Sequence, residues 1–548
     1  MTQLAWIVHL DDVQLRAAVD RLRERLRQAG VREAGISDAD AVVVWADRDL
    51  GSSVIGDLLG GTVPVLLAGP TLRSADADGR LREAAGLHLG EQTPVHDVRV
   101  RPGPDGALLP DAGHHHEGGG HIGPHEHVTD SVAVVDKVLD DVAILRVAAL
   151  GLTEQPVMTW RPATRVGTWT LGCTPASLDG RVALRAVLGF VSHASGRGRS
   201  PDVRVGLLGY GAIGHDHRRA GDAVDGLALT AVCDSAAERR AAAVAAAPGI
   251  AALDDADALI ERDDVDLVVV STPPSSHAYW ASRAIRAGKH VVVEKPFAIR
   301  TDEADAILSE AQASDRLAVV YQNRRFDPDH LAIKRAVASG SLGDLFHIET
   351  FVGGYGHPCN LWHSDQDVSG GAFYDWGSHV LDQILDLIPS DVVHVTAAEH
   401  KRLWHDVTNA DQSRVTLMFE DGTEAQFIHS DIAAALKPRW YVLGTQGAIL
   451  GSWRTERVVS RNDIGTLSED VLAPADSPPT LDLYAADGSV TRLAAPAADP
   501  YSFHRELSEH LHWGLPMSVT GAQSRRVLSV MEAARLSASE GSRPVVPA

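Results

Sequence analysis

A glycine-rich turn near the middle of the chain constrains the fold more than any other stretch. An apolar run, Val203–Leu208, leads into the turn GYGAIG (Gly209–Gly214); a helix-like segment follows, and a second apolar run, Leu227–Cys233, ends at Asp234. This succession of strand, glycine turn, helix and strand is the context that the G-x-G-x-x-G fingerprint of a dinucleotide-binding fold requires. The acidic residue follows the last glycine by about 20 residues, where a ribose-binding carboxylate belongs.

The turn and the acidic residue together predict a bound nicotinamide dinucleotide, although the turn alone could be an ordinary strand-to-helix loop. Glycines let backbone N–H groups approach a pyrophosphate at a helix N-terminus, whose partial positive charge stabilises the anion. Asp234 would accept hydrogen bonds from the adenosine ribose and repel a 2′-phosphate, which favours NAD. Arg239 and Arg240 follow closely and leave NADP open. The cofactor contacts expected here are Gly209, Gly211, Ala212, Ile213, Gly214 and Asp234.

Length and composition indicate several globular domains. A chain of 548 residues with 45% hydrophobic and 22% charged residues is too long for one core and has ordinary globular composition. The net charge of −23 argues against nucleic acid or an anionic membrane as partner. Three widely spaced cysteines, no signal-peptide pattern and no apolar run near the roughly 20 residues of a membrane helix predict a cytoplasmic protein.

The hydrophobic pattern divides the chain into three domains. Residues 1–196 alternate strands and helices, as an α/β domain with parallel strands does, and 197–201 is a short polar linker. Residues 202–325 repeat the alternation, which predicts a doubly wound, parallel Rossmann sheet of about six strands. From 326 to 548 period-two runs dominate, so we expect an α+β domain that has a large open antiparallel sheet and carries the substrate.

Each domain has its own set of predicted elements. In the first they are strands at 4–10, 41–45, 63–68, 132–135, 142–150 and 165–171 and helices at 13–28, 80–87 and 179–193. In the second they are strands at 203–208, 227–233, 265–271, 290–293 and 317–321 and helices at 236–247, 256–261, 275–287 and 302–313. In the third they are strands at 347–352, 392–399, 413–419, 423–429 and 439–443 and helices at 503–513 and 524–537.

A tract rich in glycine and histidine, Pro110–His127, interrupts the first domain. Clustered imidazoles suit zinc and nickel. The spacing matches no ordered ligand motif such as H-E-x-x-H, so a flexible polar loop is the preferred interpretation and no metal site is predicted. The histidines concerned are His114, His115, His116, His121, His125 and His127.

Polar residues follow the ends of two predicted central strands of the second domain. Ligands of open α/β sheets bind outside such carboxyl ends. A proline-stiffened loop and a solvated surface lysine are the ordinary alternatives for these positions. The residues expected to contact the cofactor there are Ser271, Thr272, Pro273, His277, Glu294 and Lys295.

A further cluster lies in the segment GGAFYDWGSHVLD, residues 370–382. Asp375 and His379 are four residues apart and Asp382 three further on, so they share one face of a predicted helix. A carboxylate and an imidazole on one face can hold a polyol and remove its hydroxyl proton. The spacing by itself would fit an ordinary pair on a helix surface equally well.

These motifs together make the chain from Val203 onward resemble the glucose–fructose oxidoreductase/inositol dehydrogenase (Gfo/Idh/MocA) family. The resemblance rests on the glycine fingerprint, Thr272-Pro273-Pro274, Glu294-Lys295-Pro296, Asn323-Arg324-Arg325 and GGAFYDWGSHVLD, in that order. It implies an NAD(P)-dependent dehydrogenase in which His379 is the general base. Lys295 would position and polarise the reacting hydroxyl, and Asp375 would bind a neighbouring hydroxyl.

The same resemblance implies a sugar or cyclic polyol as substrate and a homo-oligomer, a dimer or tetramer, paired through the open sheet face. Two alternatives stay open: an NAD-dependent glycosidase that works through transient oxidation, and a non-catalytic protein that senses sugar or cofactor. The substrate contacts that we expect are Asn323, Arg325, Trp362, His363, Asp375 and His379.

The phrase GTWTLGCTPASLDGRVALRAVLGFVSHASG, residues 167–196, resembles the C-terminal end of trehalose-utilisation (ThuA-like) domains. These are relatives of class I glutamine amidotransferases, so the resemblance implies a flavodoxin- or amidotransferase-like fold for the first domain. An amidotransferase needs a cysteine on a strand-to-helix elbow. The turn after the strand at 63–68 is Gly69-Pro70-Thr71 and has no thiol, and Cys173 lies elsewhere, so we expect no amidase activity.

Overall fold

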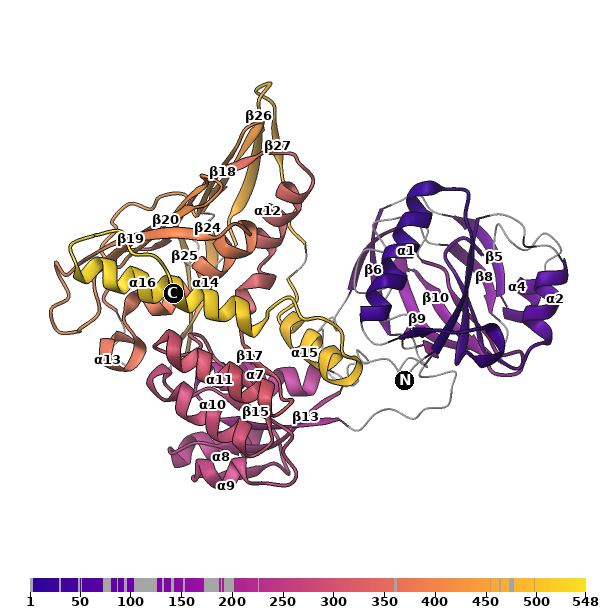
Figure 1. Ribbon diagram of the computed structural model, residues 1–548, viewed down its shortest axis with the longest axis horizontal. Helices are drawn as coiled ribbons and strands as arrows, with labels where there is room; N and C mark the ends of the chain where they lie inside the picture. Colours follow the sequence, from indigo (N-terminus) through magenta and orange to yellow (C-terminus); the bar gives the residue numbers. More distant parts are fainter. Residues whose placement is uncertain are drawn as a thin grey trace. The chain divides into compact units, whose positions relative to one another are not determined.

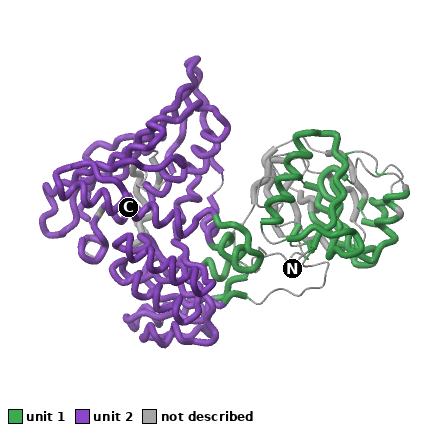
Figure 2. Tube along the Cα trace, viewed as in Figure 1, with its two compact units in different colours: residues 1–203, 219–228, 504–517 green, residues 204–218, 229–503, 518–548 purple. Residues whose placement is uncertain are grey.

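The computed structural model places most of the chain, and its elements are labelled in Figure 1. The chain forms two compact units (Figure 2): one is Met1–Val203, Arg219–Ala228 and His504–Met517, and the other is Arg204–Arg218, Leu229–Phe503 and Ser518–Ala548. The residues described are 3–28, 31–47, 50, 52–71, 80–85, 87–92, 96–102, 126–130, 133–138, 142–150, 153–171, 187–188, 190–191, 202–224, 226–358, 362–453, 455–462, 465–472, 478–496 and 498–548.

Some predictions fall outside these residues. They concern the histidine tract up to His125, Cys173 and the linker 197–201. The predicted helix at 179–193 is described only at 187–188 and 190–191, which are helical.

The first unit is built on a mixed sheet of nine strands in the order β2-β1-β3-β4-β11-β10-β9-β6-β7. Its parallel part, as predicted, consists of β2 (Arg32–Glu33), β1 (Gln3–His9), β3 (Ala41–Ala46), β4 (Val65–Ala68) and β11 (Val166–Trp169). Its antiparallel part consists of β10 (Thr153–Arg161), β9 (Ala143–Leu150), β6 (His96–Pro102) and β7 (Glu126–Asp130). Of these strands only β9 was predicted, and the prediction that it is parallel is wrong. Only two residues separate β9 from β10, and so short a connection joins antiparallel strands.

Helices cover both faces of the parallel part. Val43 and Trp45 of β3 pack in one apolar cluster with α1 (Val13–Gln28), and Val42 and Val44 pack in a second with α2 (Ser52–Gly60) and α4 (Arg80–Ala85). Such burial of alternate residues on both faces explains why the strand sequence is apolar throughout. A separate antiparallel pair consists of β5 (Leu87–Gln92) and β8 (Ala133–Val138).

The second unit contains the predicted Rossmann sheet, with six strands in the order β14-β13-β12-β15-β16-β17. Numbered from its first strand, this is the order 3-2-1-4-5-6 of a dinucleotide-binding fold. The strands are β12 (Val203–Leu208), β13 (Leu227–Cys233), β14 (Ala251–Leu253), β15 (Leu267–Val270), β16 (His290–Val293) and β17 (Ala318–Val320). The helices between them are α7 (Ala212–Ala223), α8 (Ala237–Ala246), α9 (Ala256–Ile260), α10 (His277–Arg286) and α11 (Thr301–Ala313). β14 was not predicted, because it has only three residues and no apolar alternation.

The same unit contains an eight-stranded sheet in the order β19-β20-β21-β18-β22-β23-β26-β27. Its strands are β18 (Leu345–Gly353), β19 (Val392–His400), β20 (Gln412–Phe419), β21 (Glu424–Ser430), β22 (Trp440–Gly444), β23 (Gly447–Ser452), β26 (Thr480–Ala485) and β27 (Val490–Arg492). The prediction of an antiparallel sheet is wrong for β18 and β21, which pair in parallel. A long connection that includes two α-helices and two strands separates them, as a parallel pair requires.

Helices pack on one face of this sheet, while a hairpin forms a sheet of its own. β20 alternates buried and less buried residues, and its buried side joins the core that also holds α14 (Ala372–Leu387) and α16 (Gly521–Ser539). The core is continuous with that of the Rossmann sheet. The hairpin is β24 (Thr455–Asn462) and β25 (Gly465–Leu472), and the remaining helical elements are η1 (Ile36–Asp38), η2 (Pro274–Ser276), η3 (Asn323–Phe326), α12 (Pro328–Ala338), η4 (Trp362–Ser364), α13 (Gln366–Ser369) and α15 (Ser502–Trp513). Among the described helices, none is long and apolar enough to cross a membrane.

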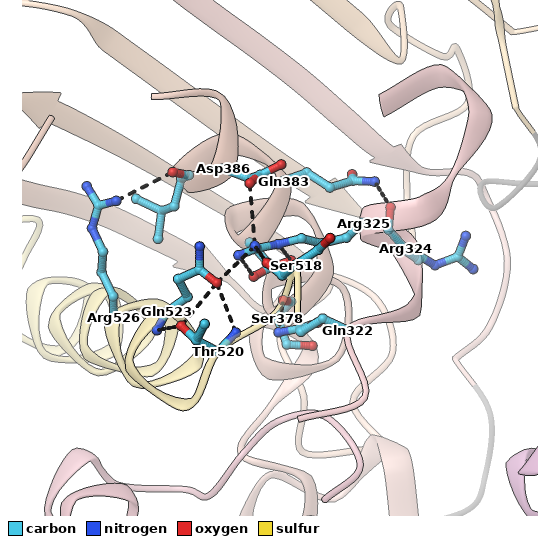
Figure 3. A network of polar contacts seen from close by, with 12 residues as sticks. Gln322, Arg324, Arg325, Ser378, Gln383, Asp386, Ser518, Thr520, Gln523 and Arg526 are labelled. Atoms are coloured by element: carbon cyan, nitrogen blue, oxygen red, sulfur yellow. Dashed lines mark hydrogen bonds and ion pairs between the residues drawn. The ribbon is translucent and has the colours of Figure 1, made fainter. Parts of the chain in front are cut away.

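A buried polar network joins η3, α14 and the start of α16 (Figure 3). Arg325 donates from Nε and Nη2 to the two carboxylate oxygens of Asp382, each at 2.7 Å, and from Nη1 to the carbonyl of Ser518 at 2.8 Å. The side chains of Arg325 and Asp382 are 3% and 1% exposed. A bidentate guanidinium–carboxylate pair this deep replaces lost hydration with directed hydrogen bonds.

We expect Asp382→Asn to destabilise the second unit by about 3 kcal/mol, because the buried Arg325 guanidinium loses its bidentate counter-charge and keeps only Asp386, at 3.4 Å from Nη1. The measurement is the urea midpoint of the full chain, followed by circular dichroism. Asp482→Asn is the control, since its partner Arg492 is 60% exposed and such pairs contribute at most about 1 kcal/mol. Equal midpoints for the two variants would contradict the structural role of the buried pair.

Candidate active site

The glycine turn lies where the strand order of the Rossmann sheet reverses, between β12 and β15. Gly209 has φ +99°, and a Cβ there would lie 2.5 Å from the carbonyl oxygen of Ser271, at the end of β15. A Cβ on Gly214 would lie 3.0 Å from the carbonyl oxygen of Gly209. The first and third glycines are therefore required by the turn and by close helix–strand packing.

The second glycine of the turn, and a serine that lies against the first glycine, fit the binding of a dinucleotide. A Cβ on Gly211 would meet no atom within 4 Å, so the N-terminus of α7 faces open space at this point. The Oγ of Ser271 is buried and has no hydrogen-bond partner in the described part of the chain. An open approach to a helix N-terminus and an unsatisfied hydroxyl at a strand end are what a pyrophosphate-binding turn needs.

Asp234 lies beside this turn, as predicted. Its Oδ2 accepts from the backbone N–H of Tyr210 at 2.8 Å, and its Oδ1 accepts from that of Ala236 at 2.9 Å. A nitrogen of Arg239 is 3.6 Å from Oδ2. The carboxylate is thus fixed at the end of β13, next to the glycine turn, where a ribose would lie.

Two residues predicted to contact the cofactor are buried inside the protein instead. The ring nitrogens of His277 lie 2.8 Å and 2.7 Å from the carbonyl oxygens of Pro296 and Thr272. Glu294 pairs with His217 of α7, with 2.8 Å between Oε1 and Nε2. Both side chains therefore hold the strand-end loops together and have no free edge for a cofactor.

Lys295, which follows β16, reaches α14. Its ammonium donates to the Oδ1 of Asp375 and lies 3.5 Å from the backbone carbonyl of the same residue. Burial would raise the pKa of the Asp375 carboxyl, but the Lys295 ammonium outweighs it and the pKa is lowered. The lysine and aspartate side chains keep 21% and 41% of their surface exposed, so a ligand can reach the ionised pair.

His379 lies one turn after Asp375 on α14 and is buried. Its Nδ1 is inaccessible and has no hydrogen-bond partner among the described residues, which leaves Nε2 as the nitrogen that a ligand can meet. Burial, and then the charges of Lys295, Arg324 and Arg439, hold its pKa well below the ordinary 6.5. The imidazole is therefore neutral at neutral pH and able to accept a proton.

The structure brings some of the predicted substrate residues close to Asp375 and Lys295 and buries another one elsewhere. Trp362 and His363 of η4 stack at 3.6 Å, and the charges of Asp375 and Lys295 act on His363, whose pKa burial lowers. Asn323 begins η3. The prediction for Arg325 is wrong, because its guanidinium is taken up by the buried network of Figure 3.

Two residues of this site, Arg324 and His429, were not among the predicted contacts. Arg324, next to the predicted Arg325, lies over the ring of Trp376 at 5.0 Å from its centroid. His429 of β21 is buried; burial lowers its pKa, and the Asp375 carboxylate acts on it from nearby. His429 lies at a core-facing position of β21, two residues after buried Phe427. A polar residue on the apolar face of a predicted strand was the sequence pattern that could have identified His429 as a site residue.

Two family models match the second half of the chain. Residues 203–322 match the oxidoreductase family with an NAD-binding Rossmann fold, and residues 330–450 match the GFO/IDH/MocA C-terminal domain. The chain is 26% identical over 358 residues to scyllo-inositol 2-dehydrogenase (NADP(+)) of Bacillus subtilis (strain 168), which covers 64% of this chain and 98% of that protein.

Two further similarities agree with these matches. The chain is 31% identical over 251 residues to inositol 2-dehydrogenase of Rhizobium meliloti (strain 1021), which covers 45% of this chain and 74% of that protein. Among solved structures, an NAD-binding protein from Listeria innocua superposes with a TM-score of 0.54 at 28% identity, over 63% of this chain and 97% of that one.

Two substitutions in the glycine turn test where the cofactor binds. Gly211→Ala should leave the melting temperature unchanged but weaken NAD binding about tenfold or more, because its Cβ enters the open space before the helix N-terminus. Gly209→Ala should lower the melting temperature as well, since its Cβ meets the backbone of Ser271 and its φ is positive. Calorimetric titration with NAD and thermal unfolding measure both. Unweakened binding by Gly211→Ala would contradict the placement of the pyrophosphate.

Proposed function

Because the chain belongs to the Gfo/Idh/MocA family of NAD(P)-binding oxidoreductases, we propose that it oxidises a secondary hydroxyl of a cyclic polyol or sugar, or catalyses the reverse reduction. The enzyme class is an NAD(P)-dependent dehydrogenase, in keeping with relatives named as inositol dehydrogenases. The observation that carries the proposal is the ionised Lys295–Asp375 pair, one helical turn from the neutral imidazole of His379. The nicotinamide, when bound, supplies the acceptor or donor of hydride.

In the proposed reaction His379 moves the proton. Its Nε2 accepts the proton of the reacting hydroxyl as the C–H bond is broken, and returns it in the reduction. The low pKa keeps this nitrogen unprotonated in the free enzyme. The burial of Nδ1 fixes which edge of the ring faces the substrate.

Lys295 and Asp375 position the hydroxyls. The ion pair directs the ammonium of Lys295, whose positive charge stabilises the oxygen that becomes negative as the proton leaves. The free lone pairs of the Asp375 carboxylate can accept from a neighbouring hydroxyl. A ring with adjacent hydroxyls suits this arrangement, because one hydroxyl meets each group. Trp362 and His363 would form the substrate-side wall.

Asp234 favours NAD over NADP in this proposal. Its carboxylate is held beside the glycine turn by two backbone N–H groups, so a 2′-phosphate would meet a fixed negative charge. Arg239, at 3.6 Å, reduces that repulsion and leaves NADP as the weaker cofactor.

The remaining parts of the proposal concern the whole chain. We place the domain boundaries at 196, 201 and 325, with a ThuA-like first domain that has no amidase activity. Pairing into a homo-oligomer through the open sheet face and a cytoplasmic location complete the proposal.

The proposal is tested by replacing its two central residues. His379→Asn and Lys295→Met should each lower kcat by about a hundredfold or more, because each removes a group that acts on the reacting hydroxyl. The measurement is absorbance of reduced cofactor, with inositols, hexoses and disaccharides as substrates and NAD or NADP. Arg286→Met, an exposed charge on α10, is the control and should leave kcat unchanged. Release of an aglycone without net reduced cofactor would identify the glycosidase instead, and cofactor binding without turnover would refute the dehydrogenase.

The pH dependence follows from the direction of the His379 shift. Because the pKa of His379 is lowered, the imidazole becomes protonated, and is lost as a base, only below pH 6.5. As the pH is raised, kcat/KM for a neutral polyol should therefore reach its plateau before pH 6.5. Arg324→Gln removes one of the charges that lower the pKa, so the acidic limb should move upward. A wild-type limb at or above 6.5, or no movement in the variant, would contradict the assignment of His379.

A further inference from the structure

His277 occupies a position between two loops that carry the site. It begins α10, is 1% exposed, and has both ring nitrogens against backbone carbonyls. Nδ1 is 2.8 Å from the oxygen of Pro296, and Nε2 is 2.7 Å from the oxygen of Thr272. Carbonyl oxygens only accept hydrogen bonds, so a ring nitrogen of His277 bonds to its carbonyl only when that nitrogen carries a proton.

The two carbonyls belong to the two halves of the proposed site. Thr272 follows Ser271, whose backbone abuts Gly209 of the cofactor turn. Pro296 follows Lys295 directly. The imidazole therefore sets the distance between the cofactor-side turn after β15 and the lysine loop after β16.

The residue before Lys295 is held in a similar way. Oε1 of Glu294 lies 2.8 Å from Nε2 of His217, a residue of α7. Oε2 of Glu294 accepts a hydrogen bond from the backbone N–H of Lys295 at 3.2 Å. Lys295 is thus flanked by Glu294 and Pro296, and each is bound by a buried histidine from a different helix. Backbone flanked in this way has little freedom to move the ammonium.

We propose that His277 is a positioning residue of the dehydrogenase site, which fixes the loop of Lys295 relative to the turn that holds the cofactor. This inference rests on the proposed role of Lys295. His277 acts through the two backbone carbonyls and touches neither substrate nor cofactor.

The two contacts of His277 can be separated chemically. A neutral imidazole has one N–H, so one tautomer donates to Pro296 and the other to Thr272, whereas the cation donates to both. Burial is the largest influence on the His277 ring and lowers its pKa, and the charge of Lys295 acts in the same direction. The contacts with Pro296 and Thr272 and the Glu294 carboxylate oppose this shift but do not reverse it. An asparagine places its amide nitrogen near the position of Nδ1, and a glutamine places it near that of Nε2.

The experiment compares these two variants in the full-length enzyme. His277→Asn keeps a donor beside the carbonyl of Pro296 and leaves the carbonyl of Thr272 without a ring nitrogen beside it, so Kd for NAD should rise about tenfold while kcat stays within about twofold. His277→Gln does the reverse: kcat should fall about tenfold while Kd for NAD stays within about twofold. A purely structural histidine would lower the melting temperature in both variants and give no such split.

Further variants make each outcome decisive. His347→Gln on β18 is the control and should change neither quantity. If Lys295→Met loses a hundredfold in kcat while His277→Gln retains wild-type kcat, the positioning role is overturned and the role of Lys295 stands. If Lys295→Met itself has the wild-type kcat, both the positioning role of His277 and the proposed role of Lys295 are overturned. Should the amide variants not fold, His277→Ala is assayed with added imidazole: recovery of kcat supports the proposal, and its absence in a folded, cofactor-binding variant overturns it.

Discussion

The ion pair between Lys295 and Asp375 is the interaction on which the proposed site depends. The apolar core shared by the Rossmann sheet and the helices on the eight-stranded sheet brings these layers together, but apolar contact has no preferred direction. The ion pair adds the direction, because it fixes where the ammonium points relative to α14. Both side chains are partly open to water, so solvent screens the pair and it adds little to stability. Its value is therefore the geometry that it gives to the site.

The buried network around Arg325 provides the rigid support for that geometry. It joins η3 to α14 by directed hydrogen bonds in a region closed to water (Figure 3). Asp382, which anchors this network, and Asp375, which pairs with Lys295, lie on the same helix. The position of the Asp375 carboxylate is thus tied to a part of the core that cannot relax without exposing a charge.

The sequence was sufficient for the Rossmann sheet apart from β14, and for the placing of Asp375 and His379 on one helix. A glycine turn between apolar runs and a four-residue spacing on a helix are local patterns, and local geometry determines both. The parallel pairing of β18 with β21 depends on a long crossover that no local period encodes. Arg324 and Arg325 are adjacent residues of one type, and only tertiary packing decides which is buried in the network and which lies over Trp376. His277 and Glu294 were predicted to contact the cofactor, but their side chains bind neighbouring loops and a helix instead. A polar residue at a strand end can serve either purpose, and only the tertiary contacts distinguish them.

The regular helix α14 has a consequence for how enzymes of this architecture diverge. Asp375, His379 and Asp382 occupy one stripe along it, at steps of four and three residues. Inserting or deleting a single residue between them would rotate one group away from the others by about 100°. Changes of chain length are therefore tolerated only outside this helix. In the proposed site, new substrate preferences would have to arise in neighbouring segments, around Trp362 and after His429, where a change of loop length leaves the spacing along α14 intact.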